Sequence, residues 1–168
     1  MIGEELDGPR RRSAAAGEGV VYPVRAPEDV AIARNQAQRL ARELGFGRKR
    51  AAEIAIVVSE LASNIVKYGV RGEIALALAA AEESRDGPGK GRGELMVVAR
   101  DAGPPIHDLA TAMRDGCDDR GPIDPAILLR RGGLGTGLGA VVRLADHFEY
   151  RHAEACAAGK EIRVGFYR

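Results

Sequence analysis

Apolar and polar positions follow two different periods along this chain. Three segments repeat apolar residues at helical spacing, and five others alternate or run apolar with β-branched residues, as strands do. The pattern predicts helices over residues 26–47, 48–69 and 137–148, and strands over residues 20–25, 72–81, 93–101, 148–155 and 160–168. Strands joined by short turns pair antiparallel, and three helices cover only one face of a sheet. We therefore predict an α/β fold: a two-layer sandwich with a mixed, mainly antiparallel sheet, covered on one face by about three helices.

The segments between these elements define the expected domain boundaries. Residues 1–18 contain Gly, Pro and a basic triplet without periodicity, which predicts a disordered N-terminal arm. Residues 19–168 are then expected to form one domain. Prolines and glycines interrupt residues 102–136, and a loop of that length inside a domain is usually functional or mobile. We expect a lid over about residues 107–136. Pro23 suggests that its strand lies at the edge of the sheet.

Composition and charge narrow the classes of partner. Apolar residues make up 45% of the chain, charged residues 29%, and the formal net charge is +1. A balance this even gives no broad electrostatic attraction to nucleic acid or to an anionic membrane. No apolar run approaches the roughly 18 residues of a membrane span, and the N-terminus lacks the apolar region of a signal peptide. We expect a cytoplasmic protein without nucleic acid or membrane as a partner.

The second predicted helix carries two stripes. One is apolar and is expected to face the core; it comprises Ile54, Val57, Val58, Leu61, Ile65 and Tyr68. The other is polar, with Glu60, Asn64 and Lys67 at positions i, i+4 and i+7. A carboxylate can take a proton from a hydroxyl, an amide oxygen can bind Mg²⁺, and an ammonium group suits a phosphate. The polar row is equally explained as the solvent-facing side of the helix.

Asp101 follows an apolar strand, and Gly103 comes two residues later. A carboxylate at the end of a strand can accept a hydrogen bond from an exocyclic amine such as that of adenine. Glycine lets the backbone approach a flat ring closely. An ordinary aspartate at a strand end before a turn fits the same residues.

A glycine-rich stretch precedes the last predicted helix. Five of the eight residues from 132 to 139 are glycine. Free backbone N–H groups and a helix N-terminus favour phosphate oxygens. The stretch lacks the GK[ST] of a P-loop. Residues 135–140 do match G-x-G-x-x-A, but only 28 residues follow Ala140, too few for the dinucleotide-binding fold that this motif normally opens.

Together, the stretches "ELGFG", "SELASNIVKYG", "RDAGPPI" and "GGLGTGLGAVVRLADHFE" resemble the GHKL (Bergerat-fold) ATPase superfamily. Within it, the chain is most similar to the anti-sigma-factor serine kinases, and especially to the switch kinases of the stressosome. The resemblance spans about residues 20–168. It implies an ATP-dependent protein serine/threonine kinase with Mg²⁺ as a cofactor. The implied partners are STAS-domain scaffold or antagonist proteins, with a downstream phosphatase or sigma-pathway regulator as a further candidate.

The resemblance also assigns roles to residues. It makes Glu60 the catalytic residue that orients or deprotonates the attacking hydroxyl, Asn64 the Mg²⁺ ligand and Lys67 a phosphate-binding residue. It places Asp101 against adenine, with Gly103 beneath the ring. The implied lid hinge and phosphate cradle comprise Gly133, Gly135, Gly137, Leu138 and Gly139.

Two positions depart from the family pattern. Pro105 stands where the Asp-x-Gly-x-Gly motif has its second glycine, and Lys160 stands where a Gly-Thr pair has its threonine. Both bear on nucleotide affinity. They leave open an alternative in which the chain keeps the fold, binds nucleotide weakly or not at all, and acts by sequestering a partner. Residues 118–131 enlarge the predicted lid; their Arg130 and Arg131 could contact phosphate or face solvent.

Overall fold

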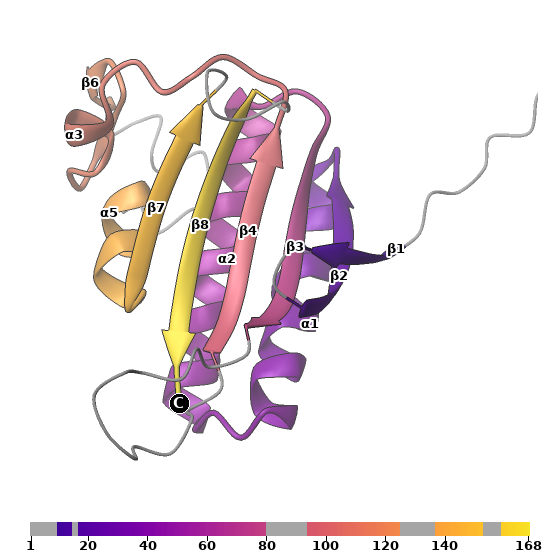
Figure 1. Ribbon diagram of the computed structural model, residues 1–168. Helices are drawn as coiled ribbons and strands as arrows, with labels where there is room; N and C mark the ends of the chain where they lie inside the picture. The colour runs from indigo at the N-terminus through magenta and orange to yellow at the C-terminus, as the bar shows by residue number, and fades with distance from the viewer. Residues whose placement is uncertain (1–9, 15–16, 80–93, 125–136, 153–158) are drawn as a thin grey trace, which may run out of the picture.

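The chain folds around one antiparallel sheet (Figure 1). The computed structural model describes residues 10–14, 17–79, 94–124, 137–152 and 159–168. The six strands are β1 (Arg10–Ala14), β2 (Gly17–Val24), β3 (Gly72–Ala79), β4 (Glu94–Asp101), β7 (His147–His152) and β8 (Lys160–Tyr167). They lie in the order β1-β2-β3-β4-β8-β7, and every neighbouring pair is antiparallel. The predicted two-layer sandwich is confirmed, with an antiparallel sheet in place of a mixed one.

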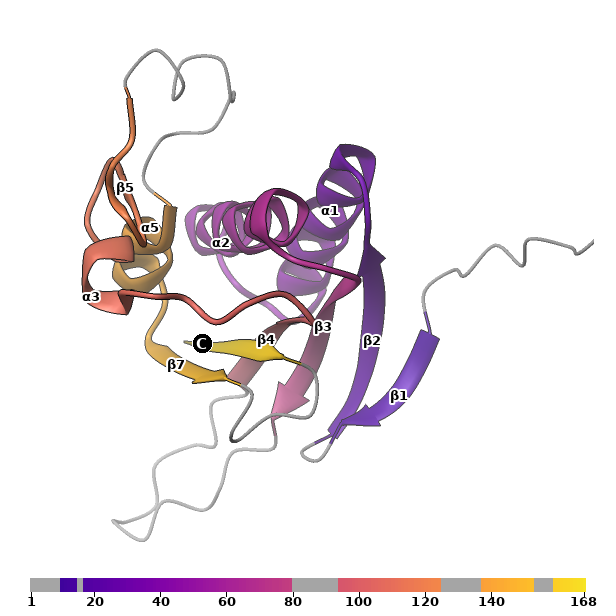
Figure 2. The same ribbon diagram turned by 90° about the horizontal axis from the view of Figure 1, so that it is seen from above.

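Three helices form the second layer: α1 (Pro27–Glu43), α2 (Arg48–Tyr68) and α5 (Gly137–Leu144). Figure 2 shows them side by side over one face of the sheet, with α2 between α1 and α5. A fourth, short helix, α3 (Leu109–Ala112), lies with the hairpin of β5 (Cys117–Asp118) and β6 (Gly121–Pro122) at the α5 end of the layer. The described helices therefore cover one face of the sheet only.

The core between the layers is built from small and branched aliphatic side chains. Ala33, Ala37 and Ala41 recur every fourth residue on α1 and are fully buried, which lets α1 pack closely on α2. The predicted apolar stripe of α2 is buried from Ile54 to Ile65. Tyr68, which was also predicted to face the core, is exposed. It is the last residue of α2.

Two segments differ from the sequence prediction. The expected disordered arm contains β1, whose residue Arg10 pairs with Val21. β2 is therefore an inner strand, and the edge position suggested by Pro23 is wrong. Pro23 pairs with Glu73 of β3, beyond the last described pair of β1 with β2. The predicted helix 137–148 ends at Leu144, because the next residues join β8: the Asp146 N–H donates to the Gly165 carbonyl at 3.0 Å.

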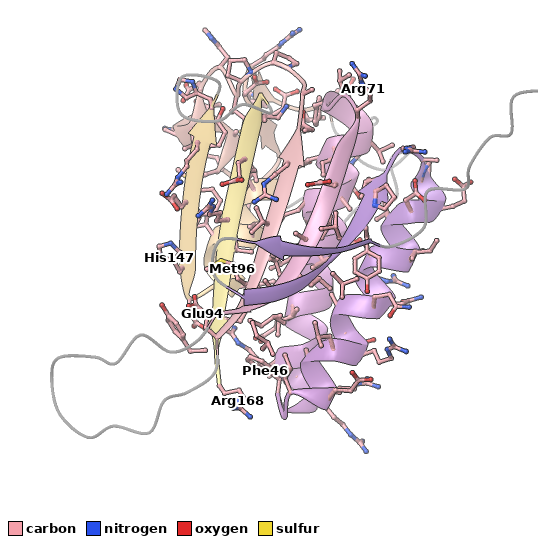
Figure 3. The ribbon with its side chains drawn as sticks, turned by 45° about the vertical axis from the view of Figure 1, so that its right-hand side comes forward. Phe46, Arg71, Glu94, Met96, His147 and Arg168 are labelled. Carbon is pink, nitrogen blue, oxygen red and sulfur yellow. The ribbon has the colours of Figure 1, made fainter. Side chains whose placement is uncertain are left out.

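The sheet face opposite the helices carries an ion-pair ladder. Figure 3 looks onto this face, where Glu94, Met96 and His147 are labelled. Across neighbouring strands Arg100 pairs with Glu73 and Glu161. Burial opposes ionisation of Glu161, but its hydrogen bonds to two arginines outweigh burial and hold its pKa below the usual value. The paired charges thus bury Glu161 on the open face, while its arginine partners stay partly exposed.

Candidate active site

The polar row of α2 lies on its water-accessible side. Glu60 and Asn64 are half-buried, and Lys67 in the last turn is exposed. Burial raises the pKa of Glu60 above its usual value, and the positive charge of Lys67 partly offsets this. The row therefore combines a partly desolvated carboxylate, an amide and an ammonium group on adjacent turns. A carboxyl group with a raised pKa is a better proton acceptor at neutral pH than an ordinary glutamate.

The end of this helix packs directly on the end of β4. The Ala102 N–H donates to the Val70 carbonyl at 2.8 Å. A Cβ atom on Gly69 would lie 2.9 Å from Cγ of Asp101, and one on Gly103 would lie 3.0 Å from the Tyr68 carbonyl oxygen. Only glycine permits approaches this close. The end of α2 that carries the polar row and the end of β4 that carries Asp101 therefore belong to one region of the molecule.

Asp101 is buried, with its side chain 5% exposed. Its Oδ1 atom accepts hydrogen bonds from the Gly103 N–H at 2.7 Å and from Nζ of Lys160 at 2.8 Å. Nζ of Lys160 also donates to the Pro104 carbonyl at 2.9 Å. Asp101 and Lys160 stand opposite each other in the β4–β8 register. The carboxylate predicted to contact adenine is thus half of a buried ion pair.

Two further glycines, at the starts of β8 and β3, lie against Asp101. Gly159 has a φ of +93°, and a Cβ atom there would lie 2.7 Å from the Asp101 carbonyl oxygen. A Cβ atom on Gly72 would lie 3.0 Å from Cβ of Asp101. The sequence prediction ended the second helix at residue 69 and did not anticipate these contacts. Their signal in the sequence was a glycine at or close to each of four ends: the end of α2, the start of β3, the end of β4 and the start of β8.

The glycine-rich stretch is described only from Gly137 onward. Gly133, Gly135, Arg130 and Arg131 lie outside the described residues. Gly137 begins α5 with a φ of +47°. Two further predicted cofactor-binding residues, Leu138 and Gly139, have packing contacts: Leu138 belongs to the core, and Gly139 is buried.

The described part of the predicted lid is anchored to α5. A Cβ atom on Gly139 would lie 2.7 Å from the Met113 carbonyl oxygen, so the chain after α3 passes close to the helix. Asp115 and Arg143 form an ion pair of 2.7 Å across the same contact. Residues 107–124 therefore contain a short helix and hairpin that rest on α5. Residues 125–136 of the predicted lid lie outside the described residues.

The donor set suits ATP and Mg²⁺. Asp101 offers a buried acceptor, and Gly69 and Gly103 keep the backbone beside it free of side chains. Asn64 offers an amide oxygen, a hard ligand of the kind Mg²⁺ takes, with Glu60 one turn away. Within the described residues, no three His, Cys, Asp or Glu side chains group as a ready-made metal site. A metal here would thus depend on Asn64 and on the phosphates it accompanies.

The fold and this arrangement define the class of protein. The family model of the histidine kinase-like ATPase domain matches residues 24–166, and the chain belongs to that family. Among curated proteins, it is similar to the serine/threonine-protein kinase RsbT of Bacillus subtilis (strain 168): the two are 36% identical over 136 residues, which is 81% of this chain and 86% of that protein. The resemblance predicted from the motifs is confirmed. No helix among the described residues is long and apolar enough to cross a membrane.

Proposed function

We propose that this chain is an ATP-dependent protein serine/threonine kinase that acts as a regulatory switch. Its proposed substrate is a STAS-domain partner in a bacterial stress or sigma-factor pathway. The family and the similarity to RsbT support phosphate transfer from ATP. The observation that carries the proposal is the placement of Glu60, a half-buried carboxylate, on the same helix face as Asn64. Burial also raises the pKa of Glu60, which fits a proton acceptor.

Each residue has a distinct task in this proposal. Bound ATP with Mg²⁺ supplies the phosphoryl group, and such transfers depend mainly on positioning and charge neutralisation. Glu60 accepts the proton of the partner's serine or threonine hydroxyl. Asn64 holds the cation through its amide oxygen, and Lys67 offers positive charge to phosphate. Asp101 accepts a hydrogen bond from the base.

The test is transfer of radiolabelled phosphate from ATP to a STAS-domain protein that co-purifies with the chain. Loss of a general base typically slows a reaction about a hundredfold to ten-thousandfold. Glu60→Gln should lose transfer by that factor, yet still bind the partner and ATP. Glu43→Gln is the matched control, because Glu43 is an exposed glutamate on α1, outside the polar row. It should transfer phosphate at the wild-type rate.

A second candidate is a module that sequesters its partner without transferring phosphate. The observation that favours it is the Asp101–Lys160 ion pair, which already engages one oxygen of the carboxylate assigned to the base. The same assay separates the two candidates. Wild-type protein that binds its STAS-domain partner but transfers no label would reject the kinase and leave the sequestering module.

A further inference from the structure

Lys160 is a charged residue built into the site, and the proposed function gives it no task. Its side chain is 11% exposed and that of Asp101 is 5% exposed. The two are fixed by their opposed positions on β8 and β4. A buried ammonium group is costly unless acceptors surround it. Here Oδ1 of Asp101 and the Pro104 carbonyl supply two acceptors, at 2.8 and 2.9 Å.

The hydrogen-bonding capacity of the pair is not exhausted by these contacts. An ammonium group has three donors, and a carboxylate can accept about four hydrogen bonds over its two oxygens. Lys160 uses two donors, and no third acceptor for it lies in the described part of the chain. Both bonds that Asp101 receives from described residues end on Oδ1, so Oδ2 receives none from them. The pair keeps one acceptor and one donor for a ligand.

Pro105 contributes to holding the donor in place. A proline restricts the backbone of the residue before it to extended conformations. Pro105 therefore restricts Pro104, whose carbonyl accepts from Lys160. The two departures from the family pattern meet at one hydrogen bond. This makes Lys160 a fixed donor rather than a mobile cation that a ligand displaces.

An acceptor beside a fixed donor matches one purine edge. Adenine presents an amine donor at C6 and an acceptor at N1. Guanine and hypoxanthine present an oxygen acceptor at C6 and an N–H donor at N1, so both contacts would be mismatched. We propose that Lys160 is a specificity-determining residue that donates to N1 of adenine while Asp101 accepts from the adjacent amine. This inference rests on the proposed function, because it takes ATP as the ligand.

The test compares the affinities of the wild-type chain for ATP and for 1-deaza-ATP, in which a C–H group replaces N1. A hydrogen bond from a charged donor is worth about 1.5–3 kcal/mol, or roughly a tenfold to hundredfold factor in affinity. We expect 1-deaza-ATP to bind more weakly by that factor and ITP to bind at least as weakly. Calorimetric titration measures all three dissociation constants without requiring phosphate transfer.

Lys160→Met then removes the donor and keeps the length of the side chain. The variant should bind ATP more weakly than the wild type, and its preference for ATP over 1-deaza-ATP should fall to about twofold or less. Lys49→Met is the matched control, because Lys49 is an almost fully exposed lysine at the start of α2. It should keep the wild-type preference. The wild-type comparison decides the proposal even if Lys160→Met does not fold.

Three results would overturn the inference, and they are distinguishable. If the wild type binds ATP and 1-deaza-ATP equally, Lys160 does not contact N1, and the proposed kinase function is untouched. If Lys160→Met binds ATP more tightly than the wild type, Lys160 obstructs the base. If the wild type binds no ATP with or without Mg²⁺, the inference and the proposed function fail together.

Discussion

Two regions of the site are built in opposite ways. Around Asp101 the carboxylate is buried, bonded to Gly103 and Lys160, and enclosed by glycines that admit no side chain. Along α2, Glu60 is half-buried and accepts no hydrogen bond from a described residue. The side chains of the first region are held in place by bonds within the described residues, whereas Glu60 in the second is not. In the proposed function, base recognition is therefore preorganised, while the transfer site is completed by nucleotide and partner.

The largest effect should come from breaking the buried ion pair. Removing one partner of such a pair leaves a buried charge uncompensated and costs about 3–5 kcal/mol. Asp101→Ala should lower the free energy of unfolding by that amount in urea titrations. Replacing both residues, as Asp101→Leu with Lys160→Met, should restore most of the stability.

The exposed ion pair between Asp115 and Arg143 is the matched control for that experiment. Its side chains are 57% and 53% exposed. Exposed pairs contribute about 0–1 kcal/mol, so Asp115→Ala should change stability by no more than that. Equal losses from Asp101→Ala and Asp115→Ala would show that the two regions do not differ in the way proposed.

An intermediate effect is expected from adding a methyl group beside Asp101. A Cβ atom on Gly103 would lie 2.7 Å from Oδ1 of Asp101 and 3.1 Å from the Gly69 Cα. Overpacking of this kind costs about 1–3 kcal/mol. Gly103→Ala should lose that much stability in urea unfolding. Gly47→Ala, where a Cβ atom meets nothing within 4 Å, should lose about 1 kcal/mol or less through its helix cap.

The smallest effect on stability concerns Glu60 and depends on pH. Because burial raises its folded-state pKa, the folded chain binds this proton more tightly than the unfolded chain does. Its contribution to stability is therefore fully present below the unfolded pKa and is lost as pH rises through the folded pKa. Glu60→Gln should be slightly more stable than the wild type at neutral pH and equal to it in acid. Paired melting curves across pH measure this; a constant offset would contradict it.

Lys67 should affect how the rate of phosphate transfer depends on pH, because it shifts the titration of Glu60. The transfer rate should rise with pH as Glu60 loses its proton, and Lys67 lowers the pKa of that step. In Lys67→Met the acidic limb of the pH–rate profile should move to higher pH. A lower maximal rate with an unmoved limb would mean that Lys67 acts on phosphate alone.

Much of the fold was accessible from the sequence because local patterns determine it. The strands predicted over 72–81 and 93–101 are found as Gly72–Ala79 and Glu94–Asp101, and α2 differs from its prediction by one residue. β1 was missed because its residues, RRRSA, show no alternation of apolar and polar positions. The end of α5 was missed because contacts with β8, distant in sequence, determine it.

Only part of the candidate site could be predicted from the sequence, because some of its contacts join residues that are distant in sequence. The polar row of α2 follows from helical spacing alone, so Glu60 and Asn64 were found together. Lys160 was noticed as a departure from a family pattern, but its partner is 59 residues away in sequence. Periodicity carries no information on which strands become neighbours. The β4–β8 register supplies it, and turns an isolated lysine into half of an ion pair.

The most direct measurement compares the ATP affinity of Glu60→Gln with that of Asp101→Asn. The account assigns base recognition to Asp101 and proton transfer to Glu60. Calorimetric titration with ATP and Mg²⁺ should give Glu60→Gln a dissociation constant within about twofold of the wild type. Asp101→Asn should bind about tenfold to hundredfold more weakly. A carboxylate only accepts hydrogen bonds, whereas an amide also presents an N–H donor, which would leave the amine of adenine badly paired. Unchanged affinity in Asp101→Asn, or an equal loss in Glu60→Gln, would contradict the division of tasks between the two regions.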